Sequence, residues 1–403
     1  MTTSMRVLHV ISSMSQLRGG PTVSMHNMLK ALRGKGITAD VVTTDDDGDT
    51  ARLDVPRDRF VDVQGQRVRY FPRQTLKYAL SAPLLPWLLR NVHTYDLVHT
   101  HGLFSFAPLA AAWCARAAGV PYIMRPAGVL DTWGMKNKSR LVKTASVRLV
   151  EARLLEAAAA VHFTTALEQA RATDLSLRIR PVVLPTGVET GGSDDPAEPI
   201  EGLAAQGTRL VLFLARIHPI KCVDMLLRAF AALEDRDSRL HLVIAGEGDA
   251  ALVAGLKALA AELQLGDRVR WLGFTAGARK RWLLARADVF VLPSASENFG
   301  IAVVEAMSAG APVIVTRGCG LADFVGQWES GMVTDGTVES LRTALARLLG
   351  DEALRRAMGQ SGRRAARQEL SLEAFGARLE GLYRSVLAGH PRRAAASLPV
   401  LKS

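Results

Sequence analysis

Short apolar runs alternate with longer stretches of helical periodicity through the first half of the chain. The runs are rich in β-branched residues, which is typical of buried strands. They lie at residues 6–11, 40–43, 68–71, 97–100, 122–125, 160–164 and 182–184. Strands that alternate with helices in this way predict an α/β fold with a parallel, doubly wound sheet.

The same alternation begins again in the second half. Its apolar runs lie at residues 209–215, 240–245, 269–272, 288–292 and 312–315. Between the halves, residues 186–207 lose the apolar periodicity and fill with Gly, Pro and acidic residues, as linkers do. Because 403 residues also exceed one ordinary core, we expect two doubly wound domains.

We assign residues 1–190 to the first domain and residues 208–370 to the second. The late helical stretch at 371–389 has no strand after it, so we expect it to cross back onto the first half. A disordered tail is expected at 390–403. Sheets of this kind bind ligands at the carboxyl ends of their strands, which predicts a binding cleft where the two domains face each other.

The most informative segment follows the strand at 288–292. Pro293 ends this strand, and a helix is expected at 300–309. The backbone amides of residues 298–301 lie at the start of that helix, where unpaired N–H groups and the helix dipole favour an anion. The sequence therefore predicts a phosphate site there.

Two carboxylates flank the same helix start: Glu297 precedes it and Glu305 lies on its second turn. Carboxylates accept hydrogen bonds from vicinal hydroxyls. A nucleotide sugar offers a matching layout of ribose diol, diphosphate and sugar diol. The alternative is that Glu297 caps the helix and that Glu305 is a solvated helix residue.

Two cations, Arg216 and Lys221, follow the strand at 209–215. Arg offers a planar fork to phosphate oxygens and Lys a compact charge, so together they can neutralise a leaving diphosphate. Without the other site residues, two exposed loop cations would be the preferred interpretation. The next two strands are followed by Gly246 and Phe274, where a nucleotide base can lie.

In the first half, Gly19 and Gly20 let the loop after the first strand approach another molecule closely. This loop is not GxGxxG, so a dehydrogenase is disfavoured. His99 and His101 project to one side of the strand at 97–101. His101 closes the carboxyl end of the strand, where an imidazole can contact a reacting sugar or its acceptor; a structural role is the alternative for both histidines.

The acidic turn from Asp45 to Asp49 is a candidate for Mg or Mn held against a diphosphate. A solvated turn is the favoured interpretation. Because Arg216, Lys221 and the helix start already neutralise the phosphates, we expect neither a metal nor another cofactor.

Composition and charge narrow the class of protein. The three cysteines are far apart and form no CxxC, so neither a disulfide framework nor a structural zinc site is supported. No signal-peptide pattern or membrane-spanning run is present, which predicts a cytoplasmic protein. The net charge of +11 allows nucleic acid, anionic membrane or a phosphorylated ligand as partner.

The basic, amphipathic stretch at 136–153 favours a membrane surface or an anionic acceptor, which would place the protein at the inner face of the cell membrane. An ordinary solvated helix face is the alternative. Aromatic residues are only 6% of the chain and no nucleic-acid module is present, so we expect no nucleic-acid partner.

Taken together, these residues resemble the retaining nucleotide-sugar glycosyltransferases of family four. The resemblance is strongest at 297–305, ENFGIAVVE, and at 215–221, ARIHPIK. It implies the GT-B architecture, in which two Rossmann-like domains face each other across a cleft. It also implies a donor in the second domain, bound by residues Gly19, Gly20, Arg216, Lys221, Gly246, Phe274, Glu297, Asn298, Phe299, Gly300, Ile301 and Glu305.

The resemblance further assigns roles to some of these residues. Arg216 and Lys221 would contact the diphosphate, Glu305 the ribose, and Glu297 the transferred sugar, which His101 would face. The segment 125–133 is similar to an acceptor-side segment of members that build cell-surface polysaccharides. It contains the acceptor-side candidates Arg125, Asp131 and Trp133. Three positions depart from the family pattern: Ala215, Cys222 and Asp323.

The implied activity is that of a hexosyltransferase that retains anomeric configuration. The donor would be a nucleotide sugar and the acceptor a glycan or a lipid-linked saccharide. The alternatives are a sugar-nucleotide-binding subunit without catalysis and an epimerase or phosphorylase of the same architecture.

Overall fold

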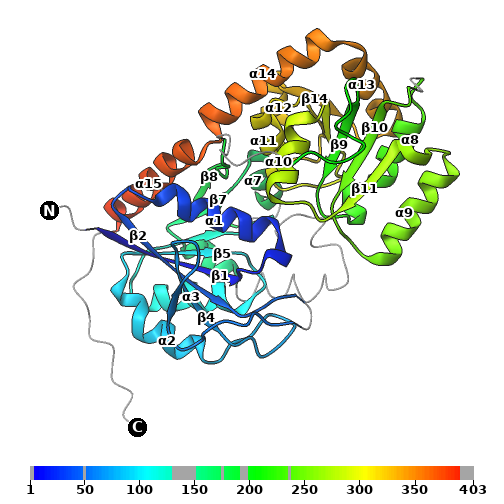
Figure 1. Cartoon of the computed structure of the whole chain (residues 1–403). Coiled ribbons are helices and arrows are strands. Elements are labelled where there is room, and N and C mark those ends of the chain that lie inside the picture. Colours follow the sequence, from blue (N-terminus) through cyan, green and yellow to red (C-terminus); the bar gives the residue numbers. More distant parts are fainter. Residues whose placement is uncertain are drawn as a thin grey trace. The chain divides into compact units, whose positions relative to one another are not determined.

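The protein forms two compact units (Figure 1). The computed structural model describes residues 4–48, 51–128, 151–173, 177–190, 198–234 and 237–390. The first unit holds the chain up to Gly187 together with the segment from Leu372 onward, and the second unit runs from Val188 to Ser371. The division thus falls at the start of the expected linker, whose residues 198–207 belong to the second unit. The expected tail beyond residue 390 lies outside the described residues.

An eight-stranded sheet in the order β3-β4-β2-β1-β5-β6-β7-β8 forms the centre of the first unit. Its strands are β1 (Met5–Ser13), β2 (Ile37–Thr44), β3 (Phe60–Asp62), β4 (Arg67–Phe71), β5 (Leu97–His101), β6 (Tyr122–Arg125), β7 (Ala160–Phe163) and β8 (Pro181–Val183). Neighbouring strands pair in parallel, which confirms the predicted sheet. The exception is β3, an unpredicted edge strand that pairs antiparallel with β4.

Helices cover both faces of this sheet, because successive residues of a strand point to opposite faces. The α-helices of this unit are α1 (Gly20–Leu32), α2 (Leu84–Asn91), α3 (Phe106–Ala117), α6 (Ala152–Ala157), α7 (Ala166–Thr173) and α15 (Leu372–Gly389). Leu8 packs into a core with α2 and α3, whereas Val7 packs into a core with α1 and α15. One stripe of α15, formed by Phe375, Leu379 and Tyr383, joins the core of the first unit.

The second unit has a six-stranded parallel sheet in the order β11-β10-β9-β12-β13-β14. Its strands are β9 (Arg209–Leu214), β10 (Leu240–Ala245), β11 (Val269–Gly273), β12 (Val289–Leu292), β13 (Val313–Thr316) and the unpredicted β14 (Gly331–Thr334). Its α-helices are α8 (Val223–Ala231), α9 (Ala250–Glu262), α10 (Gly277–Arg286), α11 (Ile301–Ala309), α12 (Ala322–Gln327), α13 (Val338–Gly350) and α14 (Glu352–Glu369).

Each sheet reverses its strand order at one point, between β1 and β5 in the first unit and between β9 and β12 in the second. Loops that leave the carboxyl ends of the two strands diverge there and open a crevice. Within each unit, the predicted site residues follow these strands and their neighbours, so the topology explains why they gather at one edge of each sheet.

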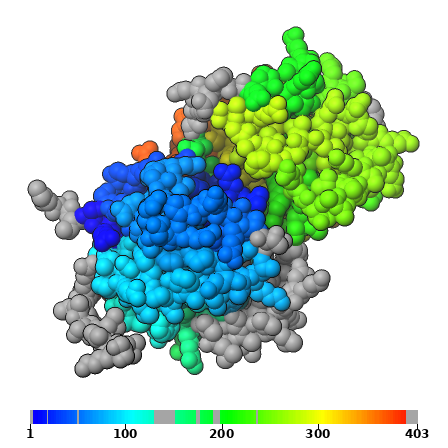
Figure 2. All heavy atoms as spheres, turned by 60° about the horizontal axis from the view of Figure 1, so that its bottom comes forward, coloured from blue at the N-terminus to red at the C-terminus, as the bar shows by residue number. Residues whose placement is uncertain are grey.

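Side chains cover the ribbons of each unit, as the space-filling view of Figure 2 shows for one face. No helix in the described part of the chain is both long and apolar enough to cross a bilayer.

Candidate functional site

In the second unit, three loops meet at the switch point of the sheet, the place between β9 and β12 where the strand order reverses. The N–H of Ala295 donates to the carbonyl of Ile220 at 2.8 Å. The N–H of Glu297 donates to the carbonyl of Gly318 at 3.0 Å, and the N–H of Gly320 donates to the carbonyl of Glu297 at 2.8 Å. Backbone bonds to a neighbouring loop therefore fix the position of Glu297.

The ammonium group of Lys221 forms an ion pair with the carboxylate of Glu297. Their side chains are 15% and 19% exposed, so the pair is shielded from water but accessible to a ligand. Arg216 is exposed on the preceding loop. An anion that binds Lys221 must therefore share its ammonium group with Glu297.

His218 lies between these two cations in the sequence. Its Nδ1 accepts the N–H of Ile220 at 3.3 Å. Burial lowers the pKa of His218, and the charges of Arg216 and Lys221 lower it further. A neutral imidazole keeps Nδ1 as an acceptor and stabilises the turn Pro219–Lys221.

Glu305 is paired with a residue that sequence reasoning missed. Lys280 of α10 places its Nζ 2.6 Å from Oε1 of Glu305, and the two side chains are 27% and 18% exposed. No spacing in the sequence connects residues 280 and 305, because the contact arises only when α10 packs beside α11.

Gly300 precedes α11 in the left-handed conformation, with φ 91° and ψ 64°. A Cβ there would lie 3.1 Å from Cγ2 of Val303, so glycine suits both the backbone and the space. The side chain of Phe299 is buried in the core, which leaves only its backbone to meet a ligand. Ile301 packs against the same core, and Asn298 is half-buried.

The structure gives Gly246 a role within the protein. A Cβ at Gly246 would lie 1.9 Å from the carbonyl oxygen of Ala215. The sequence suggested that the backbone at Gly246 lies close to a ligand. In the structure it lies close to a neighbouring loop of the protein itself. Phe274 is 67% exposed and remains accessible to a base.

Gly19 and Gly20 differ from Gly246 in their surroundings. Gly19 precedes α1 with φ 63°, and Gly20 is the first residue of the helix. Among the described residues, no atom lies within 4 Å of a Cβ built on either glycine. The space beside this loop is therefore open to another molecule.

Four histidines of the first unit and one tyrosine form a buried cluster: His9, His99, His101, His162 and Tyr383. The predicted shared orientation of His99 and His101 is confirmed by ring centroids 4.3 Å apart. Nε2 of His162 lies 2.8 Å from the carbonyl of Leu184, which can only accept, so this nitrogen carries the proton. Nδ1 of His162 must then accept from His99 at 3.4 Å, and His99 must accept from the hydroxyl of Tyr383 at 2.8 Å.

The second arm of the cluster joins Nδ1 of His9 to Nε2 of His101 at 3.1 Å. Their ring centroids are 5.3 Å apart. This is close to the largest distance possible for two rings joined by this contact, so the two centroids and the two nitrogens lie nearly on one line and the hydrogen bond is nearly straight. Burial lowers the pKa of His9 to about 3, and it lowers the pKa of His101 well below its ordinary value. Both imidazoles are therefore neutral at pH 7.

Nitrogen atoms of His9, His99 and His101 lie within 4.8 Å of one another, close enough for a metal site to be considered. Their hydrogen bonds leave too few free nitrogens for one. His99 uses both ring nitrogens for Tyr383 and His162, and Nδ1 of His9 bonds to Nε2 of His101. Of these ring nitrogens, only Nε2 of His9 and Nδ1 of His101 have no hydrogen-bond partner among the described residues, which is fewer than the three or four ligands of a typical zinc site.

Arg125, the first acceptor-side candidate, is buried and donates to the hydroxyl of Thr186 at 3.1 Å. Burial lowers its pKa. Glu168 of α7, which sequence reasoning missed, accepts the N–H of Gly128 at 2.6 Å and so holds the start of the acceptor-side segment. Asp131 and Trp133 lie outside the described residues, as does most of the basic stretch at 136–153.

The acidic turn is not solvated as expected, because Asp45 and Asp46 are buried. Asp45 accepts the N–H of Arg73 at 2.7 Å and pairs with Arg57 at 2.9 Å. Asp46 pairs with the guanidinium of Arg73. Two arginines thus balance these acids, which explains their burial, while Asp49 lies outside the described residues.

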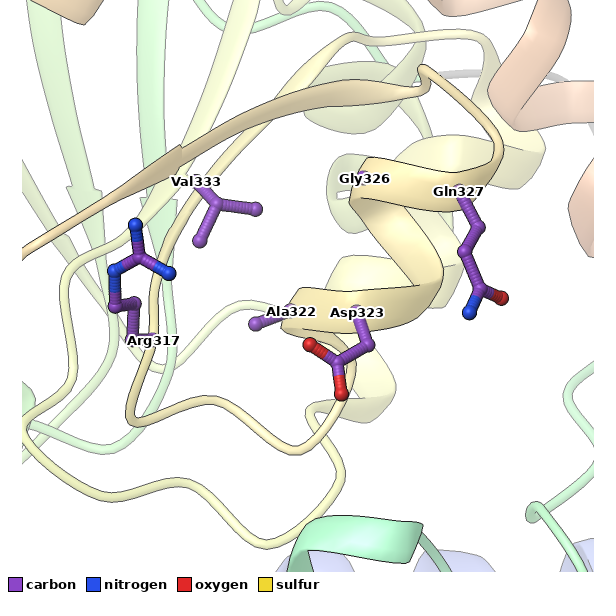
Figure 3. Close-up of a pocket in the computed structure, with 6 residues that line it drawn as sticks. All are labelled: Arg317, Ala322, Asp323, Gly326, Gln327 and Val333. Atoms are coloured by element: carbon purple, nitrogen blue, oxygen red, sulfur yellow. The ribbon is translucent and has the colours of Figure 1, made fainter.

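A hollow of about 400 Å³ opens beside α12. It is lined by Arg317, Ala322, Asp323, Gly326, Gln327 and Val333. Figure 3 shows Arg317 and Asp323 on either side of Ala322. The hollow contains none of the predicted site residues, and we assign it no function.

Two family descriptions match the chain. Residues 194–365 match the group 1 glycosyl transferases, and residues 19–187 match the glycosyl transferase 4-like domain. A D-inositol 3-phosphate glycosyltransferase of Corynebacterium glutamicum is 34% identical over 186 residues, 45% of this chain and 44% of that protein. The match thus spans less than half of this relative. The enzyme of the same name from Corynebacterium jeikeium is 27% identical over 85% of this chain and 86% of its own length.

Solved structures show the same two-domain fold. Anabaena Alr3699/HepE in complex with UDP and glucose has a TM-score of 0.74 and 19% identity, over 94% of this chain and 100% of that chain. Sucrose-phosphate synthase from Thermosynechococcus elongatus has a TM-score of 0.74 and 21% identity, over 96% and 100%. The predicted fold class, two Rossmann-like units of the GT-B type, is thereby confirmed.

Proposed function

The chain belongs to the group 1 glycosyltransferases, and we propose that it transfers a sugar from a nucleotide-sugar donor to a glycan or lipid-linked acceptor. The observation that carries this proposal is the contact between Lys221 and Glu297 at the switch point of the second sheet. A cation suited to a diphosphate and a carboxylate suited to sugar hydroxyls meet there, close to the start of α11.

In the proposed reaction, Arg216 and Lys221 neutralise the diphosphate as it leaves, and the first amides of α11 donate to its oxygens. Glu305 accepts hydrogen bonds from the hydroxyls of the ribose, and Glu297 accepts hydrogen bonds from the hydroxyls of the transferred sugar. We assign His101 a position facing that sugar: its Nε2 bonds to His9, but its Nδ1 has no hydrogen-bond partner among the described residues. The site uses no metal, because the two cations and the helix start supply the positive charge.

We propose that the transfer retains anomeric configuration. The departing phosphate helps to take the proton of the acceptor hydroxyl while the new glycosidic bond forms on the same face of the sugar. No side chain then has to act as a nucleophile, which distinguishes this route from that of retaining glycosidases.

The comparisons suggest the first substrates to test. UDP-glucose is the first donor, because the Anabaena protein forms complexes with UDP and with UDP-glucose. Lipid-linked saccharides, as in cell-surface polysaccharide synthesis, and D-inositol 3-phosphate, named in the relatives, are the first acceptors.

An assay of nucleoside diphosphate release tests the transfer directly. We expect UDP, GDP or ADP to be released from one nucleotide sugar only when an acceptor is present, equally with and without EDTA, and NMR of the product to show the donor's anomeric configuration. Release that requires inorganic phosphate would indicate a phosphorylase, and loss of activity in EDTA would contradict the metal-free site.

We also propose that the first unit binds anionic membrane at the cytoplasmic face. Leu76, Tyr78 and Leu80 are 63%, 41% and 37% exposed, with the exposed Lys77 among them. Apolar side chains beside a cation suit the boundary of an anionic bilayer. Co-sedimentation with phosphatidylglycerol vesicles should occur at low salt and weaken at moderate salt; no binding at either would contradict the proposal.

A further inference from the structure

We propose that Lys280 is a positioning residue, which holds the carboxylate of Glu305 in place for the ribose of the donor. The inference rests on the proposed function, in which Glu305 accepts ribose hydroxyls. It starts from the 2.6 Å contact between Nζ of Lys280 and Oε1 of Glu305.

The pairs Lys221–Glu297 and Lys280–Glu305 have different consequences for a ligand. Lys221 must share its ammonium group with the diphosphate, which competes with Glu297. Lys280 can stay where it is, because it occupies one acceptor position on Oε1 of Glu305. A carboxylate has about four such positions on its two oxygens, so enough remain for two vicinal hydroxyls.

Lys280 is well placed to restrict the motion of Glu305. It lies in the first turn of α10, and Trp282, Leu283 and Leu284 anchor that helix in the core. An unpaired glutamate at the surface samples several rotamers and loses this freedom when it binds a ligand. The ion pair removes part of this freedom before the donor arrives, while the 18% exposure of Glu305 keeps its carboxylate accessible.

The preceding residue of α10 supplies a matched control. Arg279 also pairs with a glutamate, Glu198, at 2.9 Å. These side chains are 62% and 54% exposed, and neither belongs to the proposed donor site. Arg279→Met removes a positive charge from α10, as Lys280→Met does.

Calorimetric titration tests the proposal. UDP, GDP and ADP are titrated into the wild type, and the tightest binder is compared with its 2′-deoxy form in each variant. Lys280→Met should weaken binding of the ribonucleotide about tenfold, because Glu305 then loses its rotamer freedom only when the ribonucleotide binds. It should weaken binding of the deoxynucleotide less. Lys280→Arg should bind nearly as well as the wild type, and Arg279→Met should be unchanged.

The comparison of two ligands within one variant separates positioning from a loss of folded protein, because unfolding would weaken both ligands equally. Equal weakening of the ribo and deoxy forms, or unchanged affinity in Lys280→Met, overturns the role of Lys280 while the proposed donor site stands. If none of the three nucleotides binds the wild type, both the inference and the proposed function are overturned.

Discussion

Cys222 occupies a backbone conformation that favours glycine. It precedes α8 with φ 49° and ψ 47°, at a position where the family resemblance leads us to expect Gly. A left-handed backbone costs a residue with a Cβ about 1 to 2 kcal/mol. Cys222→Gly should therefore raise the free energy of unfolding by about 0.5 to 1 kcal/mol, since the entropy of glycine in the unfolded chain offsets part of the relief.

Urea unfolding of the wild type, Cys222→Gly and Cys222→Ala checks this prediction. The alanine variant loses the thiol but keeps the Cβ, so it should gain nothing from relief of the backbone. An equal gain in both variants would show that the thiol, and not the backbone, is the cause.

Lys221 should contribute to the rate more than to stability. Lys221→Ala removes a cation from the leaving diphosphate and leaves the charge of Glu297 beside it. We expect the barrier to rise by about 2 to 4 kcal/mol, measured as kcat with saturating donor, and the same range for Arg216→Ala.

Arg356→Ala is the control for this loss of charge, because Arg356 forms an exposed ion pair with Glu352 in the same unit. It should leave kcat unchanged. A loss of kcat as large in this variant as in Lys221→Ala would contradict a specific role for Lys221.

At the residue scale, the sequence indicated side chains that follow strand ends but not their partners. Glu297 and Lys221 were predictable because parallel strands bring their carboxyl ends to one edge of the sheet. Lys280 and Glu168 were not, since each acts through a contact between elements distant in the sequence. The burial of Asp45 was missed because its arginine partners are 12 and 28 residues away.

At the scale of elements, α15 packs tightly against α1. A Cβ on Gly376 would lie 2.2 Å from the carbonyl oxygen of Ala31, a backbone atom that cannot move aside easily. Gly376→Ala should therefore lower the free energy of unfolding of the first unit by about 1 to 3 kcal/mol through overpacking.

Gly381 lies on the same helix, and no described atom lies within 4 Å of a Cβ built there. Gly381→Ala should instead stabilise the protein by up to about 1 kcal/mol through helix propensity. Thermal unfolding of both variants checks the pair, and a shift in the same direction for both would contradict the close packing of α15.

The elements themselves were largely predictable, because buried parallel strands are apolar and short. β3 and β14 were not predicted. β3 is a three-residue edge strand, and β14 begins with Gly331, whose Cβ would lie 1.9 Å from the carbonyl oxygen of Val313. Close approach of two backbones requires glycine there, although glycine argues against a strand when the sequence alone is considered.

At the scale of the whole molecule, the histidine cluster predicts acid lability of the first unit. Burial lowers the pKa of His9 and of His162 to about 3, and it lowers those of His99 and His101 well below the ordinary value. In the unfolded chain each of these four histidines binds a proton below about pH 6.5, whereas in the folded unit they stay neutral. The folded unit therefore has its full stability above about pH 6.5, and its free energy of unfolding falls progressively as the pH falls.

From pH 7 to pH 5.5, four such histidines should lower the free energy of unfolding by about 5 kcal/mol. Hydrogen exchange followed by mass spectrometry, corrected for the intrinsic rate at each pH, measures this loss in peptides from β1 and β5. Peptides from β9 and β12 should change less. Equal loss in both units would contradict the assignment to the cluster.

The proposed function requires the second unit to bind a nucleotide sugar without a metal. A thermal-shift panel of UDP, GDP and ADP with their common sugars tests it most directly, on the wild type and Glu305→Ala, with and without EDTA. We predict stabilisation by one nucleotide sugar that EDTA leaves unchanged and that Glu305→Ala reduces. Stabilisation by none of them, or stabilisation that EDTA abolishes, would contradict metal-free binding of a nucleotide sugar.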